Sequence, residues 1–273
     1  VGSEMCIRDS ATITLDNSTN KFGDTGSGNE VDLSTQGTSG HVTLVHGDHS
    51  ESLTFETSEV RGNLTVTTGT GGRVTQSGIL TVDGTTDITA TGGASNVFLN
   101  TRENVLTGAV SMSGHNVRLI NSKAVELGTV SARALVITAR GAVTQSGVIT
   151  TVGDSNITAQ NVAGDTNYDV TLENASNDFQ GYLKLTAANA SIKDTDALEL
   201  HLSTVSGSIS SCRVRPSAKA FPGLRRTCQA CSPSSSTGSS RRSSTFPPLS
   251  FFALSRAGRS RVSLSTSTSP ACR

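Results

Sequence analysis

Short triplets of apolar and polar residues recur along the first 211 residues of the chain. In most of them two apolar residues flank a polar or charged one, so the outer pair faces one side of an extended segment and the middle residue faces the other. Gly, Asn, Asp and Ser fill the gaps, as expected for turns. We therefore predict strands at Ile13–Leu15, Val31–Leu33, Val42–Leu44, Leu53–Phe55, Leu64–Val66, Val97–Leu99, Val117–Leu119, Val125–Leu127, Val170–Leu172, Leu183–Leu185 and Leu198–Leu200.

A longer stretch occurs twice in the chain. Val74–Ala90 reads VTQSGILTVDGTTDITA, and Val143–Ala159 reads VTQSGVITTVGDSNITA, with ten of 17 positions identical. Self-similarity of this kind is typical of repeat architectures. We interpret Gln76 and Gln145, which lie in these copies, as polar positions in a turn and assign them no chemistry.

A second alignment of the chain with itself joins these copies into larger units. It matches Leu99 with Leu172 and Asn104 with Asn177, and we call it the long register. A fainter alignment matches Asn20 with Asn104. The repeat body is thus nearly three degenerate copies of a unit of about 70–84 residues. We expect the three asparagines at equivalent turns, where Asn tolerates left-handed conformations and its amide can bond to neighbouring backbone.

The strand lengths and spacings favour an all-β solenoid. Strands of three to five residues cannot bury an apolar face in isolated hairpins, whereas stacked coils cover one another and share a continuous core. At roughly 20–24 residues per coil, the repeat body would hold about nine coils. An array of β-sandwiches is the alternative, and it would show antiparallel strand pairing.

Composition divides the chain into three segments. Residues 11–211 are the repeat body, and residues 1–211 carry all 22 acidic and 11 of the 22 basic residues. This part has a net charge of −11, and we expect no nucleic-acid partner for the body. Residues 1–10, VGSEMCIRDS, lack the alternation and resemble adapter-like translated sequence, so we predict a non-native leader. No apolar run is long enough to span a membrane, and no signal peptide is visible.

The last segment, residues 212–273, differs sharply from the body. It has no acidic residue, 11 basic residues, all six prolines and four of the five cysteines. A basic nucleic-acid- or membrane-binding arm and a zinc site at Cys228 and Cys231 are possible readings. We favour a frameshifted translation, because Arg-, Ser-, Pro- and Cys-rich text without acidic residues is typical of an out-of-frame read of GC-rich DNA. In each case we expect a disordered tail.

Two clusters of side chains suggest chemistry, and for each we favour a turn. His41, His46, Asp48, His49 and Glu51 are metal-capable, but their block HGDHSE lies between two strand triplets and is typical of a polar turn.

Asp194 and Asp196 could project from one face of an extended segment, as paired carboxylates do in glycoside hydrolysis and calcium binding. The long register places Asn121 and Lys123 at these positions, so we predict a solvated turn.

Gly69, Gly71 and Gly72 form a glycine-rich loop that lacks the helix and Lys-Ser/Thr of a phosphate cradle. We predict no catalytic residue, no cofactor and no metal site.

The pieces VTLENASNDFQG, ASIKDTDALEL and GAVTQSGVITTVGDSNITA resemble the repeat regions of filamentous-haemagglutinin-like exoproteins and large autotransporter passengers of Gram-negative bacteria. This resemblance implies a right-handed parallel β-helix, export to the cell surface with an outer-membrane secretion partner, and a role as an adhesin stalk or scaffold. It also implies that the chain is an internal fragment.

Two functions follow as hypotheses. The first is a non-enzymatic structural or adhesive segment of a secreted or cell-surface protein, with glycans or proteins of a host or environmental surface as partners. The alternative is a carbohydrate-active β-helix enzyme, a polysaccharide lyase or hydrolase. That alternative requires Asp194, Asp196 and partners from a neighbouring coil to converge within about 5–10 Å.

Overall fold

The computed structural model describes residues 5–9, 12–18, 20, 22, 30–36, 40–47, 52–196, 198–211 and 225–227. All of them belong to one compact unit, Val1–Cys231; the second unit, Ser232–Arg273, lies outside the described residues. The described part contains strands and turns and no helix. In particular, it has no helix that is long and apolar enough to cross a membrane.

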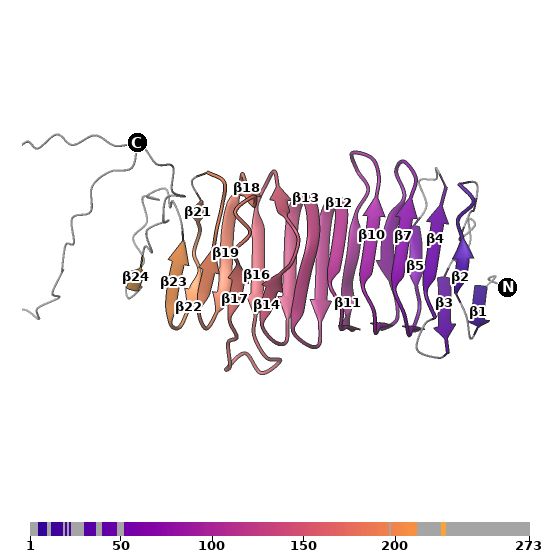
Figure 1. Ribbon diagram of the computed structural model, residues 1–273, viewed down its shortest axis with the longest axis horizontal. Helices are drawn as coiled ribbons and strands as arrows, with labels where there is room; N and C mark the ends of the chain where they lie inside the picture. The colour runs from indigo at the N-terminus through magenta and orange to yellow at the C-terminus, as the bar shows by residue number, and fades with distance from the viewer. Residues whose placement is uncertain are drawn as a thin grey trace, which may run out of the picture. The chain divides into compact units, whose positions relative to one another are not determined.

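The strands stack in parallel as the turns of a β-solenoid (Figure 1). Every pairing between named strands in the described part is parallel, which excludes the β-sandwich alternative there. Each predicted triplet lies in a strand, except that Leu198 forms a bridge just before its strand. The solenoid has about eight turns, not the nine predicted.

Strand register sorts the strands onto three faces. The first face holds β2 (Ile13–Leu15), β4 (Val42–His46), β7 (Leu64–Thr68), β10 (Thr86–Ala90), the start of β12 (Val110–Asn121), the middle of β13 (Val125–Ala139), β15 (Ile149–Thr151) and β18 (Asp178–Phe179). The second holds β1 (Met5–Asp9), β3 (Glu30–Thr35), β5 (Ser52–Phe55), β8 (Arg73–Gln76), the start of β11 (Val97–Leu106), the ends of β12 and β13, β16 (Ser155–Ala159), β19 (Tyr182–Ala187), β21 (Glu199–Leu200) and β22 (Thr204–Val205). The third holds β6 (Ser58–Val60), β9 (Leu80–Val82), the end of β11, the start of β13, β14 (Val143–Gln145), β17 (Val170–Leu172), β20 (Ala190–Ile192), β23 (Ser208–Ser211) and β24 (Arg225–Thr227).

The turns vary in length, which explains the lower count. Val117 lies opposite Leu135, one short turn later, whereas a much longer stretch of chain separates Ser155 from its partner Leu183. The longer turn contains an excursion at residues 160–167, closed by an antiparallel bridge between Gln160 and Asn167. An estimate from one uniform coil length could not include this insertion.

The core is a set of apolar columns that run through the stack. Val74, Val97, Val117 and Leu135 follow one another on the second face, and each is fully buried. Burying such a side chain contributes about 1.5–3 kcal/mol. Each turn therefore depends on its neighbours for most of its stability, as in other solenoids.

The sequence repeat does not correspond to a whole number of turns. Thr86 and Ser155 occupy equivalent places in the two copies of the 17-residue stretch. Thr86 pairs with Val110 on the first face, whereas Ser155 pairs with Leu135 on the second. Each repeat unit thus ends one face further round the solenoid than it began.

Two segments that we expected outside the fold contribute strands. Met5–Asp9, in the predicted leader, forms β1 and pairs with β3. Arg225–Thr227, in the predicted disordered tail, forms β24 and pairs with β23. The rest of residues 212–273, including Cys228 and Cys231, lies outside the described residues.

Candidate functional site

The glutamine of the first VTQSG copy is a buried structural side chain. Gln76 ends β8 and is 4% exposed. Its side-chain Nε2 donates to Asn104 Oδ1 at 3.0 Å, and Asn104 Nδ2 donates back to Gln76 Oε1 at 3.0 Å. Asn104 also accepts from the backbone N–H of Leu80 and donates to the carbonyl oxygens of Leu99 and Ile120. This amide pair joins three successive turns of the solenoid.

The second VTQSG copy repeats the arrangement. Gln145 Nε2 donates to Asn177 Oδ1 at 2.7 Å, and Asn177 Nδ2 donates to Gln145 Oε1 at 2.9 Å. Asn177 accepts from the N–H of Ile149 and donates to the carbonyl oxygen of Leu172, as its counterpart does. The interpretation of the glutamines as polar turn positions is therefore wrong, since they end strands and bond between turns.

Asn20 adopts the same turn as Asn177. The backbone N–H of each donates to the carbonyl oxygen three residues earlier, of Asn17 and of Asn174, at 2.9 and 3.1 Å. The carbonyl of Asn20 accepts in turn from Gly47 N at 2.8 Å. The predicted equivalence of the three asparagines is confirmed for this backbone turn in the first and third units, and for the side-chain bonds in the second and third.

A second buried position recurs one turn further on, and here the residue changes. The backbone N–H of Phe22 donates to His46 Nδ1 at 3.2 Å, that of Leu106 to Asn121 Oδ1 at 2.9 Å, and that of Phe179 to Asp194 Oδ1 at 3.1 Å. The three acceptor residues are 0%, 0% and 7% exposed. His, Asn and Asp thus play the same part, which is to cap a buried N–H of the turn before.

The hydrogen bond from Phe22 gives His46, a member of the predicted histidine cluster, a structural role. His46 lies at the end of β4, where its ring stacks on Phe22 with centroids 6.1 Å apart, so it belongs to the core and not to a polar turn. His41 is exposed and accepts from the N–H of Asn63. Asp48, His49 and Glu51 lie outside the described residues.

The glycine-rich loop is a tight turn between β7 and β8. Gly71 has a φ of 85°, which side chains other than glycine rarely adopt. Gly72 N donates to Gly69 O at 3.1 Å, and Gly69 N donates to His46 O in the turn below at 2.7 Å. These backbone N–H groups donate to carbonyl oxygens of the solenoid itself.

In the third unit, two further carboxylates lie close to the capping residue Asp194. Asp178, Asp194 and Asp196 each offer an oxygen, and these oxygens lie within 4.8 Å of one another. Burial raises the pKa of Asp194, against the bond from Phe179 N, which lowers it; Asp196 and Asp178 add to the rise. We call this set the acidic corner. The prediction of a solvated turn is wrong for Asp194, which is buried, although Asp196 is exposed.

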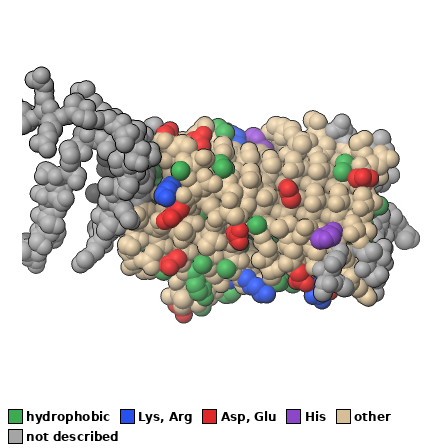
Figure 2. Space-filling model, viewed as in Figure 1, with side chains coloured by type: hydrophobic (Ala, Val, Ile, Leu, Met, Phe, Trp, Pro, Cys, Tyr) green, Lys and Arg blue, Asp and Glu red, His purple; other side chains and the backbone are tan. Residues whose placement is uncertain are grey.

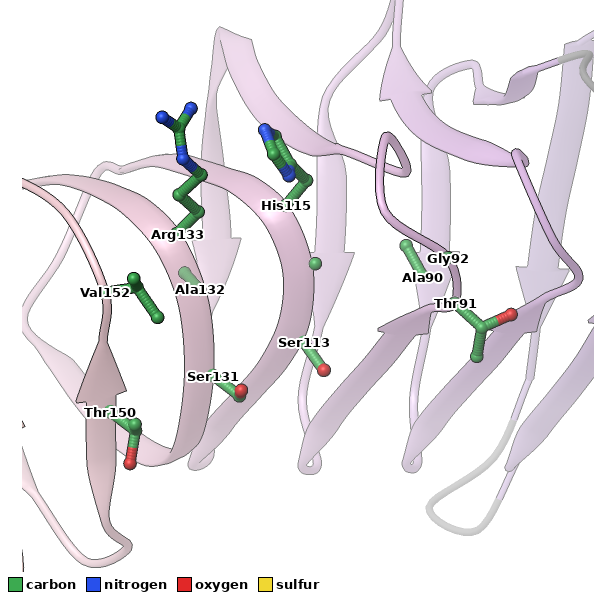
Figure 3. Close-up of a pocket in the computed structure, with 11 residues that line it drawn as sticks. Ala90, Thr91, Gly92, Ser113, His115, Ser131, Ala132, Arg133, Thr150 and Val152 are labelled. Atoms are coloured by element: carbon green, nitrogen blue, oxygen red, sulfur yellow. The ribbon is translucent and has the colours of Figure 1, made fainter.

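A shallow groove crosses the first face where β12 and β13 curve onto the second (Figure 3). Ser113 pairs with Ser131 and Ser131 with Thr150, so one hydroxyl-bearing residue follows another from turn to turn. His115 and Arg133 lie along the same side of the groove. The groove has a volume of about 410 Å³ and is lined by Ala90, Thr91, Gly92, Ser113, Gly114, His115, Ser131, Ala132, Arg133, Thr150 and Val152.

The remaining surface has no single charge character on the face that Figure 2 shows. Acidic, basic and apolar side chains are scattered there among neutral polar side chains and backbone. A surface of this kind agrees with turns and strand faces rich in Thr, Ser and Asn.

The stacked parallel strands and the recurring amide pairs define a β-solenoid repeat protein. The chain belongs to the family described as repeats of unknown function (DUF5649), whose model matches residues 39–113 and 114–186, more than half of the 273 residues. The matched segments agree with the unit of about 70–84 residues predicted from the internal repeats. No curated protein and no solved structure matches the chain.

Proposed function

We propose that this chain is a non-enzymatic, structural and adhesive segment of a secreted or surface-displayed bacterial protein, an adhesin stalk or scaffold. The resemblance to filamentous-haemagglutinin-like exoproteins and autotransporter passengers supports this reading. Under the proposal the segment is exported with an outer-membrane secretion partner. Its partners are glycans or proteins of a host or environmental surface.

The observation that carries the proposal is the use to which the repeated side chains are put. Gln76 with Asn104, and Gln145 with Asn177, recur in both units, and both pairs bond turn to turn inside the stack. Such residues specify how turns stack, because their side-chain amides bond to each other and to neighbouring backbone. The repeated part of the unit therefore supports an extended scaffold.

The groove on the first face supports a contact with an extended partner. Ser113, Ser131 and Thr150 follow one another at the spacing of adjacent strands, about 4.8 Å. Hydroxyl groups both donate and accept hydrogen bonds, as the hydroxyls of a glycan do. A glycan chain lying along the stack would meet one such group per turn.

A carbohydrate-active enzyme is the second candidate, because the acidic corner brings carboxylates from neighbouring turns within 4.8 Å. Two features make it the weaker one. Asp194 is only 7% exposed, and its Oδ1 accepts from Phe179 N. A carboxylate held in this way cannot approach a glycosidic bond, and glycoside hydrolysis requires two accessible carboxyl groups on either side of that bond.

Binding of the full chain to an array of surface polysaccharides, combined with an assay for released reducing or unsaturated ends, tests the proposal. We expect retention on at least one extended glycan without cleavage. Ser131→Tyr, which fills the groove, should weaken retention at least tenfold, whereas Thr65→Tyr, exposed on β7 outside the groove, should not. Cleavage that is lost in Asp196→Asn would overturn the scaffold reading in favour of the enzyme.

A further inference from the structure

We propose that the acidic corner, formed by Asp178, Asp194 and Asp196, binds a Ca²⁺ ion that joins two successive turns of the solenoid. Asp178 lies in β18, on one turn, and the other two lie in the segment after β20, on the next. The bond from Phe179 N to Asp194 Oδ1 already holds these turns together at this point. The site is additional to the scaffold function and does not depend on it.

The first reason is uncompensated charge. Each of the three carboxylates places an oxygen within 4.8 Å of the others. Among the described residues, no ion pair includes any of them. The side-chain donor from the described residues that reaches the acidic corner is neutral, since Gln180 Nε2 donates to Asp178 Oδ2 at 3.0 Å. Like charges this close repel one another unless a cation or a proton intervenes.

The second reason is an oxygen that stands where the preceding unit has a donor. In the second unit Asn121 Oδ1 accepts from Leu106 N, and Asn121 Nδ2 donates to the carbonyl oxygens of Leu106 and Ala124 at 3.1 and 3.0 Å. Asp194 Oδ1 takes the same role in the third unit, so its Oδ2 occupies the place of that nitrogen. Asp194 Oδ2 is buried, and with both carboxyl groups ionised no donor from the described residues reaches it.

A bound cation resolves this arrangement, because it turns a set of mutually repelling oxygens into ligands. The neighbouring unit has no such set. In the long register, Asp178, Asp194 and Asp196 match Val105, Asn121 and Lys123, which supply an apolar side chain, an amide and a cation. We therefore expect the calcium site in the third unit and not in the second.

The ligand chemistry favours calcium. All three side chains offer oxygen, whereas structural zinc sites are built from sulfur and nitrogen ligands. Two oxygens bound to one Ca²⁺ at about 2.3–2.6 Å lie at most about 5 Å apart. The observed limit of 4.8 Å fits that geometry. Mg²⁺ requires a smaller and more regular octahedron, so it should bind less well.

The test uses the full chain, stripped with EDTA and titrated with CaCl₂ or MgCl₂, with thermal unfolding and hydrogen exchange of the Phe179 amide as readouts. We expect a saturable rise in melting temperature and slower exchange in Ca²⁺, with a Kd of about 0.1–1 mM, as for extracellular calcium modules. Mg²⁺ should give a smaller effect at equal concentration.

Variants locate the ion. Asp194→Asn copies the residue of the second unit, so it should keep the strand-type circular dichroism spectrum and weaken Ca²⁺ binding at least tenfold. Asp196→Lys, which copies Lys123, should do the same. Glu126→Gln removes an exposed carboxylate on β13 and should leave the calcium response unchanged.

Either of two results overturns the proposal. One is an unchanged melting temperature and exchange rate of the parent chain at about 10 mM CaCl₂, well above the expected Kd. The other is a calcium response in Asp194→Asn equal to that of the parent. Both would leave the carboxylates to share protons without a metal.

Discussion

The second and third units solve the same packing problem with different residues. In the second, the amide of Asn121 both accepts from the turn before and donates to carbonyl oxygens around it. In the third, Asp194 keeps the accepting half and loses the donating half. The difference is one atom: a carboxylate oxygen replaces an amide nitrogen, so a buried donor becomes a buried acceptor that favours a proton or a cation beside it.

Exchange of the two residues should have its largest effect in the second unit. Asn121→Asp places a carboxylate oxygen against the carbonyls of Leu106 and Ala124, so we expect a loss of about 3 kcal/mol in the free energy of unfolding at pH 7. Urea unfolding of the full chain followed by circular dichroism measures it. Lys123→Ala, an exposed change next to the same corner, should cost less than about 0.5 kcal/mol. Equal losses in both variants would contradict the comparison.

The two glutamine–asparagine pairs should also differ in their contribution to stability, with the larger effect again in the second unit. Gln76 is 4% exposed, so Gln76→Ala removes two hydrogen bonds from the buried amide of Asn104 and should cost about 2 kcal/mol. Gln145 is only partly buried, and water can replace part of its bonding to Asn177, so Gln145→Ala should cost about 1 kcal/mol. The same urea experiment ranks the two. The reverse ranking would show that burial does not set the strength of these pairs.

The reciprocal change in the third unit should stabilise the protein. Asp194→Asn restores a donor at the place of the bare oxygen, so we expect a gain of about 1 kcal/mol in EDTA at pH 7. The gain should shrink in millimolar CaCl₂, because the parent chain then binds the ion more tightly than Asp194→Asn does. A loss of stability in EDTA would mean that Asp194 makes a favourable contact that its asparagine counterpart lacks.

The smallest effect is a pH slope. The pKa of Asp194 is raised in the folded protein, so protonated Asp194 favours the folded state. This contribution to the free energy of unfolding is complete below the unfolded pKa of about 3.9 and is lost as the pH rises through the folded pKa. In EDTA the parent chain should therefore lose stability relative to Asp194→Asn as the pH increases from about 4. Melting temperatures of both chains across this range provide the measurement, and parallel curves would refute it.

The strands and the core could be read from the sequence because their signal is local. A triplet such as Val117–Leu119 carries its own inward and outward positions, and both outer residues are fully buried. The internal repeats likewise indicated a stacked architecture, and the family match agrees with the repeat length. The number of turns was less predictable, since an excursion such as residues 160–167 has no fixed spacing.

The amide pairs and the capping hydrogen bonds could not be predicted in the same way, because each depends on a contact between residues that are distant in the sequence. Gln145 meets Asn177 across 32 positions, and Phe179 meets Asp194 across 15. A signal was present nevertheless. The long register aligns Asp194 with Asn121, and the sequence also predicts that the amides of Asn104 and Asn177 can bond to neighbouring backbone. A polar residue in the sequence therefore does not by itself indicate solvent exposure, because a polar side chain between stacked turns can bond to the backbone.

The advance of each unit by one face sets the symmetry of any array of these units. Equivalent residues follow a coarse screw around the axis, so Thr86 and Ser155 point in different directions although they share a place in the repeat. A partner gripping one side would meet the same feature only at every third unit. Any bend that a unit introduces is likewise cancelled by its successors, which favours a straight shaft.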